Sequence, residues 1–119
     1  MGYTHLNRND PAIETWHGVF AKIRRALGTT AVGINEVRMP PGFEGVRHDE
    51  AETGHEEVYL VLSGSGTATI DGESLPLVEG DYLRVDPAST RLVTAGDEGL
   101  TFVVVGARPQ PAYDGRASL

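Results

Sequence analysis

The chain has 119 residues, a length typical of one domain, and it contains no cysteine, which excludes disulfides and thiolate metal sites. Its 10 basic and 17 acidic residues give a formal net charge of −7, which argues against nucleic acid and against a membrane surface as partners. The sequence shows neither an apolar run as long as a membrane span nor an N-terminal signal core, so we expect a cytoplasmic protein.

The first 29 residues predict an N-terminal extension that packs on, or pairs with, the main domain. Its one ambiguous segment is Val19 to Leu27. Phe20, Ile23 and Leu27 fit a helical stripe, whereas alternate residues of the same segment fit a strand. We favour the strand, added as an edge to a sheet.

The rest of the chain is divided into short apolar runs by 15 glycines and 7 prolines, which is typical of many short strands. The predicted strands are Thr30–Met39, Glu57–Leu62, Gly66–Ile70, Glu73–Val78, Tyr82–Val85, Arg91–Ala95 and Leu100–Val105. Asp71-Gly72 predicts a tight hairpin turn, because both turn residues adopt positive φ readily. This pattern indicates an all-β sandwich or barrel over residues 30–106, followed by a surface or flexible tail over residues 107–119.

The segment His48–Glu57, with the sequence HDEAETGHEE, places two histidines and five acids directly before an apolar strand. A carboxylate carried into the interior by that strand needs a positive partner, because an unpaired buried charge is costly. The partner is either a metal ion or a basic side chain.

Two spaced motifs resemble those of the cupin superfamily. The first runs from Gly42 to Gly64, with five residues between Gly42 and His48 and six between Glu57 and Gly64. The second runs from Gly80 to Arg91, with a two-strand spacer between the motifs. The resemblance covers about residues 30–106 and implies a double-stranded β-helix, or jelly-roll barrel, with a pocket at one end. It also implies the family's usual divalent metal, held by three His and one Glu.

The sequence departs from that ligand set. Glu50 stands where the motif has its second His, and Arg91 stands where it has its third, so only His48 and Glu57 match. Alternation along extended chain places His48 with Glu50, and His55 with Glu57 and Tyr59. One hypothesis is therefore a metal site of His48, Glu50, His55 and Glu57 that holds Fe, Mn, Zn or Ni.

The alternative hypothesis needs no cofactor. Arginine has no lone pair with which to ligate a metal, but its guanidinium can replace the metal by forming a two-pronged ion pair with Glu57 or Glu50. The pocket would then bind a small organic molecule through Arg91, His48, Glu57 and Tyr59. In this interpretation, Arg91 and His48 orient an anionic group of that molecule, such as a carboxylate.

We therefore expect a small-molecule-binding cupin-domain protein. The alternative is a divalent-metal-dependent cupin enzyme of the oxygenase, isomerase or decarboxylase type. We also expect a homodimer, because barrels of this kind commonly pair through sheet edges. Fold alone does not choose between these functions.

Overall fold

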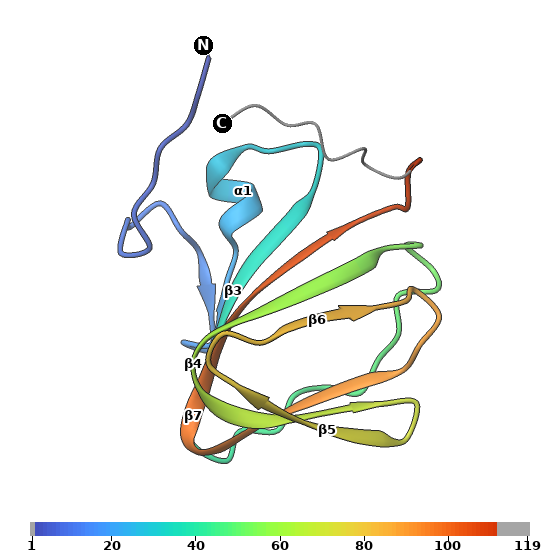
Figure 1. Cartoon of the computed structure of the whole chain (residues 1–119). Helices are drawn as coiled ribbons and strands as arrows, with labels where there is room; N and C mark the ends of the chain where they lie inside the picture. The colour runs from blue at the N-terminus through green and yellow to red at the C-terminus, as the bar shows by residue number, and fades with distance from the viewer. Residues whose placement is uncertain (1, 112–119) are drawn as a thin grey trace.

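The structure, a computed structural model, describes residues 2–111 and consists mainly of antiparallel strands (Figure 1). The predicted all-β class is therefore confirmed. In chain order the elements are β1 (Thr15–Trp16), β2 (Phe20–Ala21), α1 (Ile23–Leu27), β3 (Gly33–Met39), β4 (Glu56–Ile70), β5 (Glu73–Val78), β6 (Tyr82–Val85) and β7 (Arg91–Ala107). The one helix in this part of the chain is far too short to cross a bilayer.

Two long strands, β4 and β7, pair along nearly their whole length and form the frame of the barrel. The strand order is β1-β2-β3-β7-β4-β5, and β6 pairs with β4 on a separate branch. Both long strands bend together in Figure 1, at the register shifts between Val61 and Ser63 and between Gly64 and Gly66. Bulges bend strands in this way, and here they let one strand serve both layers. Four of the predicted short strands are thus the halves of β4 and β7.

The hairpin between β4 and β5 turns at Asp71-Gly72, as the sequence predicts. Both residues have positive φ, 48° and 85°, which is the backbone conformation that a two-residue turn of this kind requires. The turn sets the register in which Ile70 faces Glu73 and Ala68 faces Leu75. The local sequence therefore determines how β5 is placed against β4.

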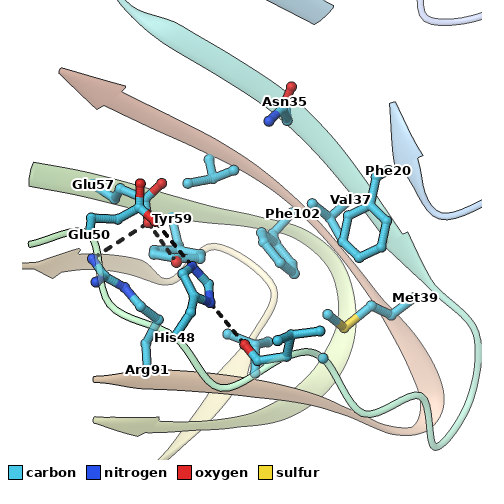
Figure 2. A pocket seen from close by; sticks show the side chains of 14 residues that line it. Phe20, Asn35, Val37, Met39, His48, Glu50, Glu57, Tyr59, Arg91 and Phe102 are labelled. Carbon is cyan, nitrogen blue, oxygen red and sulfur yellow. Dashed lines mark hydrogen bonds and ion pairs between the residues drawn. The ribbon is translucent and has the colours of Figure 1, made fainter. Parts of the chain in front are cut away.

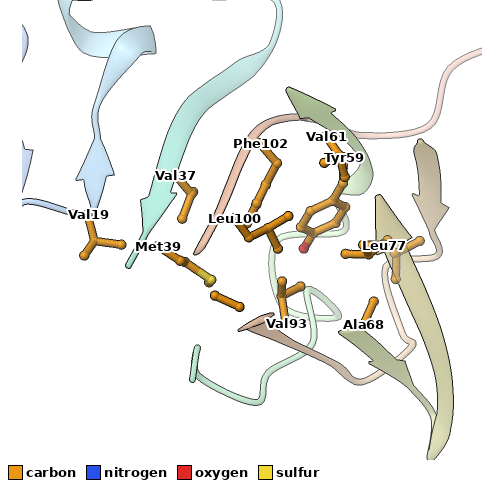
Figure 3. Packing of buried hydrophobic residues seen from close by; sticks show 12 residues of the cluster. Val19, Val37, Met39, Tyr59, Val61, Ala68, Leu77, Val93, Leu100 and Phe102 are labelled. Atoms are coloured by element: carbon orange, nitrogen blue, oxygen red, sulfur yellow. The ribbon is translucent and has the colours of Figure 1, made fainter. Parts of the chain in front are cut away.

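Alternating residues of β3, β4 and β7 point into the barrel and form its core (Figure 3). Tyr59 and Val61 come from β4, and Leu100 and Phe102 from β7; all four are at least 95% buried. The rings of Tyr59 and Phe102 lie 5.5 Å apart between centroids. Because side chains in a strand alternate between faces, the residues two before Tyr59 and two after Phe102 also face inward, at the open end of the barrel.

The N-terminal extension is joined to the barrel by strand pairing and by an ion-paired carboxylate. Phe20 and Ala21 pair with Val37 and Glu36 of β3. The buried carboxylate of Glu36 accepts from two guanidinium groups, with its oxygens 2.9 Å from Arg8 and 2.6 Å from Arg38. The Glu36 carboxylate is thereby paired, as a buried charge must be.

The prediction of a strand over Val19–Leu27 is wrong for its second half. Phe20–Ala21 does add an edge to the sheet, but Ile23–Leu27 forms a helix that ends at Gly28 in the left-handed conformation. Ile23 and Leu27, four residues apart, lie on one side of this helix. Arg24, Arg25 and Ala26 between them favour helix, which the strand interpretation overlooked. At the other end of the chain, Ala107 closes β7 and residues 108–111 are exposed, whereas residues 112–119 of the expected tail lie outside the described residues.

The bend of β4 provides a test of the fold. Gly64 and Gly72 both have positive φ, but a Cβ added at Gly64 would collide with the carbonyl oxygen of Gly99, whereas one at Gly72 would meet open space. We expect Gly72→Ala to lower the free energy of unfolding by about 1 kcal/mol, the cost of the backbone conformation. Gly64→Ala should cost more than about 3 kcal/mol, because the strands must also separate. Urea unfolding of both variants measures this, and equal losses would contradict the close approach at the bend.

Candidate functional site

A cavity of about 300 Å³ opens at one end of the barrel, between the inward faces of β3, β4 and β7 and the segment that precedes β4. Figure 2 shows its side chains divided between a polar end and an apolar end. The polar end consists of His48, Glu50, Glu57, Tyr59 and Arg91. The apolar end includes Phe20, Val37, Met39 and Phe102, and Asn35 lies apart from both.

Arg91, the first residue of β7, is the most deeply buried charged group of the cavity, with 1% of its surface exposed. Its Nη2 atom lies 3.5 Å from Oε1 of Glu57, whose side chain is 16% exposed. The guanidinium also donates to three backbone carbonyls: Ser89 at 2.8 Å, Asp86 at 3.3 Å and Pro87 at 3.5 Å. The pair with Glu57 is therefore a single contact rather than the predicted two-pronged one, because the segment before β7 takes most of the donors.

Glu57 also accepts a hydrogen bond from the hydroxyl of Tyr59, at 3.0 Å. Burial, followed by the negative charge and the hydrogen bond of Glu57, raises the pKa of Tyr59 well above its ordinary value of 10, and Arg91 only partly offsets this. Tyr59 thus remains a neutral hydrogen-bond donor at any physiological pH. Glu57 has room beside β7 because its partner there is Gly106, where a Cβ would lie 3.2 Å from Cγ of Glu57.

His48 is held beside Arg91 by the backbone. Each of the two residues donates its N–H to the other's carbonyl, at 3.0 and 2.8 Å, in an isolated antiparallel bridge. The Nδ1 atom of His48 lies 2.9 Å from the carbonyl oxygen of Val46, so Nδ1 must carry the proton and donate it. In the neutral ring, Nε2 is therefore an acceptor, and it lies 3.5 Å from a carboxylate oxygen of Glu50.

The four residues of the predicted metal site are not brought together. His48, Glu50 and Glu57 line the cavity, but His55 is not among its lining residues. Strand β4 begins only at Glu56, so the alternation that would have aligned His55 with Glu57 does not extend back to it. Within residues 2–111, no three His, Asp or Glu side chains converge closely enough to hold a metal ion. A guanidinium instead lies against Glu57, so the donor set does not fit a divalent metal.

The sequence interpretation missed Asn35 and Phe20. Asn35 shares the inward face of β3 with Val37 and Met39, so alternation along that strand could have identified it. No motif could have placed Phe20, which reaches the cavity from the N-terminal extension.

Tyr59 provides a test of the polar end through the pH dependence of stability. Its pKa in the folded protein is raised above the value of about 10 expected in the unfolded chain, so above pH 10 the folded state binds more protons than the unfolded state. The stabilisation is complete below pH 10 and is lost as the pH rises, with a slope approaching about 1.4 kcal/mol per pH unit. Urea unfolding from pH 8 to 11 should show this slope, and Tyr59→Phe should reduce it. Identical slopes in the two proteins would show that Tyr59 is not held as described.

The chain was compared with protein families, curated proteins and solved structures. The family model of the cupin domain matches residues 35–106. No curated protein gives a significant match. A cupin protein from Bacteroides fragilis superposes with a TM-score of 0.78 and 24% identity, over 100% of this chain and 99% of that one.

Two further solved structures illustrate the range of similar proteins. A sugar phosphate isomerase of the cupin superfamily from Silicibacter pomeroyi is 26% identical, with a TM-score of 0.67, over 88% of this chain and 67% of that one. A predicted oxalate decarboxylase from Thermotoga maritima is 24% identical, with a TM-score of 0.63, over 72% of this chain and 74% of that one. The family match covers more than half of the sequence and agrees with the observed barrel. This chain therefore belongs to the cupin domain family.

Proposed function

We propose that the protein binds a small organic molecule in the barrel cavity. The observation that carries this proposal is the division of the cavity into a polar end and an apolar end (Figure 2). Its volume of about 300 Å³ lies at the lower limit of small-molecule sites. Such sites combine apolar walls with a few placed polar groups that orient the ligand.

The polar end is accessible as well as ordered. The side chains of Glu57, Glu50 and His48 are 16%, 21% and 44% exposed, so a ligand can reach them from the mouth of the cavity. Each is held by protein contacts: Glu57 by Tyr59 and Arg91, Glu50 by Thr53, and His48 by Val46. A site arranged before binding loses less side-chain entropy when a ligand arrives, which favours affinity.

In this proposal, Arg91 positions the other residues of the site and does not itself bind the ligand. Its guanidinium fixes the segment from Asp86 to Ser89 and compensates the charge of Glu57. This differs from the expectation that Arg91 orients an anionic ligand, because most of its N–H groups already have acceptors within the protein.

Binding in the cavity can be tested by replacing a lining residue with a larger side chain that fills the cavity. Val104 of β7 lines the cavity, whereas its neighbour Val105 is not a lining residue and points to the other face of the strand. We expect a collection of small polar metabolites, screened by ligand-observed NMR, to contain molecules that bind the native protein. Val104→Trp should abolish that binding, and Val105→Trp should preserve it. A ligand that binds both variants equally well, or a screen without any ligand, would contradict the proposal.

A further inference from the structure

We propose that the cavity selects a ligand with a positively charged head group that donates hydrogen bonds, a small organic ammonium with an apolar body. This inference rests on the proposed function and names the class of its ligand. The charges and hydrogen-bonding atoms of the polar end that remain available to a ligand favour a cation that donates hydrogen bonds.

The charges at the polar end do not balance. Glu50 and Glu57 each carry a carboxylate, and Arg91 is the one Lys or Arg among the residues that line this cavity. Arg91 lies beside Glu57, which leaves the carboxylate of Glu50 without a Lys or Arg partner among these lining residues. An anionic head group would therefore meet uncompensated negative charge, whereas a cationic one would neutralise it.

The hydrogen-bond donors of the polar end are already engaged. Arg91 donates from both Nη atoms to backbone carbonyls, Tyr59 donates to Glu57, and Nδ1 of His48 donates to Val46. The remaining donor of Arg91, Nε, has no hydrogen-bond partner in the described part of the chain, but it is so deeply buried that it has almost no accessible surface. A carboxylate or phosphate would thus find few free donors here.

The acceptors, in contrast, remain available. Oε1 of Glu57 receives the hydrogen bond of Tyr59, but no hydrogen bond from within residues 2–111 reaches its Oε2 atom. Oε2 of Glu50 lies 3.5 Å from Nε2 of His48, and it receives no hydrogen bond from within residues 2–111. An ammonium group offers three donors and one positive charge, which matches this set of acceptors.

The apolar end indicates what the head group is attached to. The aromatic rings of Phe20 and Phe102 and the side chains of Val37 and Met39 face the polar end across the cavity (Figure 2). A ligand whose ammonium group lies at Glu57 would place its remaining atoms against this surface. A short aliphatic or aromatic amine satisfies both ends, whereas a small inorganic cation would leave the apolar end uncovered.

The test uses three probes of nearly equal size and different charge: benzylamine, which is an ammonium ion at pH 7, benzyl alcohol and benzoate. Titrations of the native protein followed by backbone amide NMR give the three dissociation constants. We expect benzylamine to bind at least about tenfold more tightly than benzoate, with benzyl alcohol between them. The largest shifts should fall on the amides of His48, Glu50 and Glu57.

Charge-neutral variants identify the groups responsible. Glu57→Gln should reduce the preference for benzylamine over benzoate by at least about fivefold, and Glu50→Gln, nearer the mouth, should reduce it as well. The matched control is Glu56→Gln, because Glu56 is the neighbouring residue of β4, forms an ion pair with Arg84 and does not line the cavity. It should leave the preference unchanged, and an equal effect at Glu56 would overturn the assignment.

Benzoate or benzyl alcohol binding as tightly as benzylamine would also overturn the inference, while the proposed function would stand. Binding of none of the three probes would overturn it too, and the comparison of Val104→Trp with Val105→Trp would still decide the proposed function. The two proposals can therefore fail separately.

Discussion

The organisation of this barrel depends on one constraint: a charged side chain inside a β-barrel must find a charge of opposite sign. Alternation along β4 carries Glu57 inward together with Tyr59 and Val61, so Glu57 cannot avoid the interior. A carboxylate in that position without compensation would cost several kcal/mol. Arg91, at the start of β7, supplies the compensating charge and is itself almost completely buried. Because each of these groups needs the other, the sheet that carries Glu57 and the segment before β7 are held in one arrangement.

The same pairing determines what the cavity offers to a ligand. A guanidinium normally presents five donors, but here the backbone carbonyls from Asp86 to Ser89 and the carboxylate of Glu57 face both of its Nη atoms. Arg91 therefore contributes charge and position rather than free hydrogen bonds. The groups that a ligand can still reach are the carboxylate of Glu57 and, at the mouth of the cavity, the side chains of His48 and Glu50. In our proposal, the site therefore accepts hydrogen bonds and attracts cations, even though Arg91 lies at its base, because the donors of Arg91 are used within the protein.

Much of the fold could be predicted from the sequence, because its signals are local. The Asp71-Gly72 turn and the alternation in Glu73–Val78 and Tyr82–Val85 depend on residues next to one another. The continuity of β4 and β7 through their bends could not be predicted, because the bulges arise from the pairing of one long strand with the other. The motif spacing indicated that His48, Glu57 and Arg91 lie near one another. The spacing could not show where the donors of Arg91 are directed, because the carbonyls that accept them belong to a loop. It also aligned His55 with β4, although that strand begins one residue later, at Glu56.

The coupling energy between Arg91 and Glu57 tests the central claim most directly. It is obtained from the free energies of unfolding of the native protein, Arg91→Met, Glu57→Gln and the double variant, measured in urea at pH 7. Glutamine at position 57 retains an acceptor for the hydroxyl of Tyr59. Both proteins that carry Met at position 91 lose the loop contacts of Arg91, so this loss largely cancels in the coupling energy. If the two side chains stabilise each other as charges, the double variant should be more stable than the sum of the single losses predicts, by about 1–3 kcal/mol. Losses that add to within about 0.5 kcal/mol would show that the two charges are independent and would contradict the account.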